Sequence, residues 1–155
     1  MPYSYDPRSY PSLVISLRFW EYFLKNKDKE TIFYIETIFD NNLVIVNDLI
    51  NTISFNLNNY NLKMCFDIGY ANIFSKIKIT KWIEKTNKNI GFVNLYNNDG
   101  KNNELNGLNN GKINMKKICS ALEKYCPNAV WKIKTTEYEE SIEWLIKNKY
   151  IKIRI

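Results

Sequence analysis

Hydrophobic residues follow two spacings in the first third of this chain, one typical of helices and one of buried strands. In residues 11–25 the apolar positions share one face of a helix: Leu13, Leu17, Trp20 and Leu24. Residues 31–35 instead form a continuous β-branched and aromatic run. This run predicts a buried strand with Glu36 at its end.

The same alternation continues to the end of the chain. Further strands are predicted at 62–68, 90–96 and 129–134, and further helices at 43–55, 79–86, 114–125 and 138–148. Asn114 is placed to cap the helix that it begins. Residues 1–10 and the glycine-containing stretch 97–112 are predicted loops. The tail 150–155 fits either a short edge strand or an irregular end.

One helix followed by four strand–helix units predicts an α/β fold with parallel strands. Four such units are half of an eightfold β/α barrel, whose usual length is about 250 residues. The 155 residues are therefore interpreted as a single half-barrel domain, 1–155. A small open α/β sheet is the alternative.

Composition removes several function classes. The net charge is +6, but the lysines are scattered and arginine is rare, so a nucleic-acid surface is not expected. Three cysteines without a C-x-x-C spacing predict neither a disulfide framework nor a zinc site, and they suit the cytoplasm. No segment reaches the ~18 apolar residues of a membrane span, and no signal peptide is expected. Histidine is absent, so any mechanism must work without the commonest acid, base and metal ligand.

Polar side chains stand at the predicted strand ends, where β/α folds place their active sites. They are Glu36, Asp67, Asn94, Tyr96 and Lys134. Two carboxylates at neighbouring strand ends are a possible divalent-metal pair. Capping of the turns that follow the strands explains them equally well.

Three segments carry a more specific resemblance: FDIGYANIFSK, WIEK and IGFVNLYNNDGKNNELNGLNNGKIN. In sequence and spacing they resemble the sugar phosphate isomerase/epimerase family, which has a xylose-isomerase-like barrel and counts endonuclease IV as a relative. The resemblance covers nearly the whole chain and corresponds to strands 5–8 of that barrel. It implies metal ligands at Glu36 and Asp67 and a pocket that involves the following residues: Tyr70, Asn94, Tyr96, Asn97 and Glu104.

The departures from the family pattern affect its metal site. Family histidines fall at Tyr70 and Asn94, an Asp falls at Asn97, and the last strand's Glu aligns with Lys134. The Asp-x-His pair of the long loop is Asn103 and Leu105. Asn and Tyr are poor ligands for Mn or Zn, and an ammonium repels a cation. We therefore expect a degenerate isomerase/epimerase-like protein with no metal cofactor and no metal-dependent catalysis.

The alternative is an active isomerase or epimerase, so enzymatic activity stays open. Glu36 would be its base, and Mn, Mg or Zn would be held by Glu36 and Asp67 with ligands from a second chain. A phosphodiesterase of the endonuclease type needs a metal cluster and ranks last.

Lys134 has three interpretations. Its ammonium could neutralise Glu36 or Asp67, it could act as a Schiff-base or general-base lysine, or it could be solvated. The aromatic residues Tyr70, Trp82, Phe92 and Tyr96 fit a sugar pocket or the core. Expected partners are a sugar or sugar phosphate, and either a second copy of the chain or a separate N-terminal half-barrel.

Overall fold

A computed structural model describes residues 10–25, 27–28, 30–37, 43–57 and 62–151. The helices are α1 (Tyr10–Lys25), α2 (Leu43–Asn56), α3 (Ile68–Phe74), α4 (Ile79–Thr86), α5 (Met115–Tyr125) and α6 (Tyr138–Lys147). The strands are β1 (Phe33–Glu36), β2 (Leu62–Asp67), β3 (Ile90–Leu95) and β4 (Val130–Ile133). The strands form one all-parallel sheet in the order β1-β2-β3-β4. The α/β prediction is therefore confirmed, with an open four-stranded sheet.

The predicted elements are present with small shifts at their ends. Asn114 caps α5, because its side-chain oxygen accepts a 3.1 Å hydrogen bond from the Lys117 amide. The tail differs from the edge-strand option as far as it is described: Tyr150 stacks on Trp144 at 5.9 Å between ring centroids. The loop predicted at 1–10 and the last residues of the tail lie mainly outside the described residues.

Helix α3 was not predicted. Residue 68 was assigned to the strand, but β2 ends at Asp67 and α3 begins with the next residue. Asp67 is itself the N-cap: its Oδ1 accepts a 2.9 Å hydrogen bond from the Tyr70 amide. The strand therefore turns into a helix with no loop between them.

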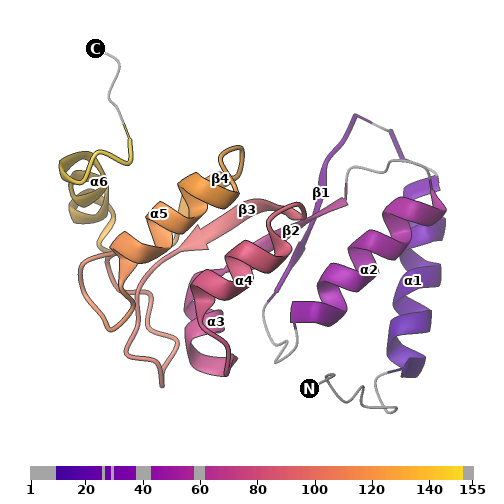
Figure 1. Cartoon of the computed structure of the whole chain (residues 1–155), viewed down its shortest axis with the longest axis horizontal. Coiled ribbons are helices and arrows are strands. Elements are labelled where there is room, and N and C mark those ends of the chain that lie inside the picture. Colours follow the sequence, from indigo (N-terminus) through magenta and orange to yellow (C-terminus); the bar gives the residue numbers. More distant parts are fainter. Residues whose placement is uncertain (1–9, 26, 29, 38–42, 58–61, 152–155) are drawn as a thin grey trace.

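The two faces of the sheet differ. Helices α2, α4 and α5 lie on one side of it, where α4 packs against α5 (Figure 1). Strand side chains pointing to that side enter the hydrophobic core, among them Met64, Phe66 and Val93. The opposite side, called the open face below, carries Tyr34, Glu36, Lys63, Cys65, Phe92, Asn94, Val130, Lys132 and Lys134. None of these side chains belongs to that core.

A one-residue irregularity aligns β3 with this pattern. Met64 is in register with Ile90, but the next residue, Cys65, is in register with Phe92. The extra residue is Gly91, and it restores the side-chain alternation so that Phe92 and Asn94 reach the open face.

The long loop after β3 is held by Asn97. Its buried amide donates to the carbonyl oxygens of Leu108 (3.0 Å) and Ile113 (3.2 Å). Its Oδ1 accepts from the amides of Asn98 and Ile113, both at 2.9 Å.

None of the helices within the described ranges is long and apolar enough to cross a membrane.

Candidate functional site

The carboxyl ends of the four strands bring one polar cluster together. It consists of the side chains of Glu36, Asp67, Asn94, Tyr96 and Lys134. These are the five strand-end residues singled out from the sequence. Parallel strands end at one edge of a sheet, so residues distant in the chain meet there.

Asp67 is the centre of the cluster and is fully buried. Its Oδ1 accepts hydrogen bonds from the Tyr70 amide and from the Tyr96 hydroxyl, the latter at 2.6 Å. Its Oδ2 accepts from Asn94 at 3.2 Å and from the Lys134 ammonium at 3.3 Å. Four donors, one of them charged, compensate the removal of this carboxylate from water.

Lys134 joins both carboxylates. Its Nζ lies 3.3 Å from Asp67 Oδ2 and 3.4 Å from Glu36 Oε1. The expected ion pair is therefore present, and Lys134 forms it with both carboxylates. Partial burial alone would lower the pKa of Lys134, but the charges and hydrogen bonds of Asp67 and Glu36 outweigh it and raise that pKa. A lysine that acts as a base or forms a Schiff base needs a lowered pKa. This geometry therefore favours the ion-pair interpretation.

Glu36 is the most accessible member, with 36% of its side chain exposed. Its Oε1 accepts from Asn94 Nδ2 at 2.7 Å as well as from Lys134. Both contacts use the same oxygen, so within the described residues Oε2 remains available to accept a hydrogen bond from a ligand.

Tyr96 is a buried member of the cluster. Its ring lies against Gly69 of α3, where any β-carbon would collide with it. Burial, followed by the hydrogen bond to Asp67, raises the pKa of Tyr96, so the hydroxyl stays protonated and donates. The hydroxyl also lies 2.8 Å from Asn103 Oδ1, which links the long loop to the cluster.

A hollow of about 460 Å³ opens beside these groups on the open face. Its walls include Glu36, Asn94 and Lys134 together with Cys65, Phe92 and Lys132. Burial, and then the charges of Glu36 and Asp67, raise the pKa of the Cys65 thiol to about 11. Cys65 therefore lines the hollow as a neutral thiol and not as a nucleophile.

The remaining predicted pocket residues lie elsewhere or contribute through their backbone. Tyr70 donates its backbone amide to the Asp67 carboxylate, and its ring stacks on Phe74. Asn97 holds the loop, and Glu104 is exposed and accepts from Asn106. Trp82 is a core residue. Cys65 was not among the candidates, although it stands two residues before Asp67, as strand alternation requires for the same face. Asn103 was named only as a replaced family ligand position.

The cluster does not fit a divalent metal as it stands. Within the described residues no three His, Cys, Asp or Glu side chains converge. More directly, Oε1 of Glu36 and Oδ2 of Asp67 already bind an ammonium. A cation there would have to displace Lys134 against charge repulsion.

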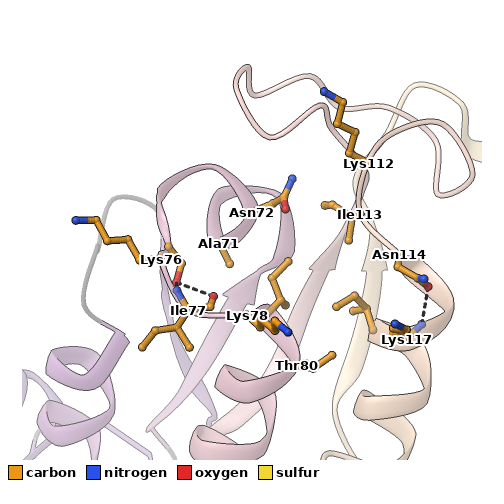
Figure 2. Close-up of a pocket in the computed structure, with 13 residues that line it drawn as sticks. Ala71, Asn72, Lys76, Ile77, Lys78, Thr80, Lys112, Ile113, Asn114 and Lys117 are labelled. Carbon is orange, nitrogen blue, oxygen red and sulfur yellow. Dashed lines mark hydrogen bonds between the residues drawn. The ribbon is translucent and has the colours of Figure 1, made fainter. Parts of the chain in front are cut away.

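A second hollow, of about 360 Å³, lies between α3 and the first turns of α4 and α5. Among the described residues that line it there are four lysines and no carboxylate: Lys76, Lys78, Lys112 and Lys117. Figure 2 shows that Lys76 and Lys112 direct their ammonium groups away from the hollow. The rim is positive, but these charges do not converge on one point, so the carboxyl-edge cluster is the better candidate.

Comparison with protein-family models, with curated proteins and with solved structures finds no match to this chain.

Proposed function

We propose that this chain is a degenerate relative of the sugar phosphate isomerases and epimerases that binds a sugar or sugar phosphate without metal-dependent catalysis. The observation that carries the proposal is the position of Lys134, whose ammonium lies between Glu36 and Asp67. It supplies the positive charge that a metal would otherwise supply to two carboxylates.

The accessible groups suit a polyhydroxylated ligand. Glu36 Oε2 can accept from a sugar hydroxyl, and Lys134, with 30% of its side chain exposed, can donate to one. Lys132 lines the same hollow and is exposed, so it can attract a phosphate group. Phe92 contributes an apolar wall against which a sugar ring can pack.

The proposal is tested by thermal melts with and without excess Mn²⁺, because a ligand that binds the folded state raises the melting midpoint. The unaltered chain is expected to show no shift. Lys134→Glu removes the ammonium and adds a third carboxylate, so this variant is expected to gain a Mn²⁺-dependent shift. Lys116→Glu, which makes the same charge change on the outer surface of α5, is the control and should show none.

Binding and catalysis are then separated by NMR in D₂O with a panel of pentoses, hexoses and their phosphates. An isomerase or epimerase exchanges the proton next to the sugar carbonyl with solvent. We expect ligand-dependent perturbation of Asn94 and Lys134 signals without deuterium incorporation. A Mn²⁺ shift in the unaltered chain, or deuterium incorporation, would contradict the proposal.

The second candidate is an active isomerase that a second chain completes, with Glu36 as base. The accessible Glu36 carboxylate and the open face beside it favour this alternative. It requires deuterium incorporation that appears with metal and is lost in Glu36→Gln.

A further inference from the structure

The open face is the largest unexplained feature of the molecule. Parallel sheets occur almost always with both faces covered. Here helices cover one face, while Tyr34 and Val130 on the other are 37% and 53% exposed. A third hollow of about 490 Å³ lies on the open face toward the amino ends of the strands, lined by Ile32, Tyr34, Lys63 and Val130 among others. Such a surface needs a covering partner.

Both edges of the sheet are also free to accept a strand. Among the described residues, no strand lies outside β1 or outside β4. The Lys134 amide donates to Leu95 and the Thr37 amide donates to Cys65, both toward the inside of the sheet. Because backbone groups alternate along a strand, those of Ile133 and Glu36 point outward. Each edge strand has four residues, so the two edges match in length.

The two edges carry opposite charge on the open face. Glu36 stands on β1, whereas Lys132 and Lys134 stand on or beside β4. Lys134 and Glu36 Oε1 are paired with each other within the chain, but Lys132 is exposed and has no ion-pair partner in the part of the chain that the structure describes. A sheet with one acidic edge and one basic edge is complementary to a second copy of itself.

Apolar side chains accompany both edges. Helix α1, at the β1 end of the molecule in Figure 1, exposes Ile15 (68%) and Phe19 (58%). Helix α6, at the β4 end, borders an apolar hollow of about 350 Å³ with Tyr138 and Ile142. Exposed apolar surface at both ends is expected where copies of a chain associate head to tail.

We propose that a second copy of this chain covers the open face. Strand β4 of each copy pairs in parallel with β1 of the other, which makes eight strands, the number that closes a filled parallel barrel. Pairing that keeps the open-face side chains of the two strands on one side places Glu36 of the second copy beside Lys134 and Tyr34 beside Lys132. The polar clusters of the two copies then lie at the same end of the barrel, at the carboxyl ends of its strands. Each copy supplies the missing wall of the other's site. This proposal does not depend on whether the site is catalytic.

The first test is the molar mass of the full chain by light scattering after size-exclusion chromatography. We expect twice the 18.5 kDa of one chain, about 37 kDa, across micromolar concentrations. Lys132→Glu places like charges at both seams and should shift the species to a monomer. Lys116→Glu, with the same change of charge away from the sheet, should remain a dimer.

A cross-link tests the seam itself in the folded protein. Tyr34→Cys and Lys132→Cys are introduced together, with Cys65→Ala to remove the thiol on the same face. Within one copy the two positions are three strand spacings apart, about 14 Å, which is too far for a disulfide. Oxidation should therefore give a covalent dimer, and either substitution alone should not.

Three results would overturn the proposal. One is a monomer at every concentration, with a folded circular dichroism spectrum. Another is a dimer that Lys132→Glu leaves intact and the cysteine pair does not cross-link. The third is a ladder of larger oligomers, which would mean that the edges pair without closing after two copies.

Discussion

The ammonium of Lys134 lies 3.3 Å from a carboxylate oxygen of Asp67, and the Asp67 side chain has no exposure to solvent. A buried carboxylate is costly unless it is paired and hydrogen-bonded, so this contact is both a feature of the site and a contribution to the stability of the fold.

Replacing Lys134 by Met is expected to lower the free energy of unfolding by about 1–2 kcal/mol, because Asp67 loses its charged donor and the pair is partly screened by solvent. Urea unfolding at neutral pH measures this. Lys116→Met, on the outer surface of α5, should change stability by much less.

The contribution of Lys134 also has a pH signature. Its pKa is raised above the ordinary value of 10.5, so its stabilisation is complete below pH 10.5 and is lost as pH rises through the raised value. The stability difference between the unaltered chain and Lys134→Met should therefore be constant at neutral pH and shrink above pH 10.5. A difference that grows with pH would show that Lys134 is not the stabilising cation.

The three cysteines are expected to resist alkylation in the native state. Burial is the largest cause that raises their pKa values, to about 11 for Cys65 and Cys126 and about 12 for Cys119. At pH 8 a thiol with a pKa near 11 is roughly one part in a thousand thiolate, the reactive form. Mass spectrometry after iodoacetamide treatment should show little labelling in buffer and three labels in urea.

Gly69→Ala is expected to destabilise the fold by about 1–3 kcal/mol, because the new methyl group would collide with the ring of Tyr96. Gly107→Ala is the matched control. There the closest atom is Oε2 of Glu137, the end of a flexible side chain, at 2.7 Å. Equal effects of the two substitutions in thermal melts would argue against the tight packing of Tyr96.

Asn97→Asp tests whether this position holds the loop or belongs to a metal site. A carboxylate would face the carbonyl oxygens of Leu108 and Ile113 in place of a donor, so the expected cost is at least about 2 kcal/mol. Asn109→Asp, at an exposed position of the same loop, should be close to neutral. Stabilisation of Asn97→Asp by Mn²⁺ would instead indicate a metal ligand.

Much of this architecture could be read from local patterns. Continuous apolar runs gave the strands, and the cap at Asn114 gave the start of α5, because these features depend on a few neighbouring residues. The five strand-end side chains could be grouped because parallel strands end at one edge.

Other features depend on contacts between distant residues. The register shift at Gly91 is determined by how β2 and β3 pair, and Asn103 reaches Tyr96 because the long loop folds back. Neither is encoded in a local period. Helix α3 was missed because apolar residues continue past Asp67 and Gly69 is a poor helix former, although Asp67, a residue type that favours the N-cap position, was the available signal.

Asp67 ends β2, caps α3 and binds Lys134, so the same side chain starts the helix and organises the site. Folding of this segment and assembly of the site are therefore one cooperative event. The amide hydrogen of Tyr70, which bonds to Asp67 Oδ1, is shielded when both are formed. The exchange rate of that single hydrogen with deuterium reports how often the site comes apart.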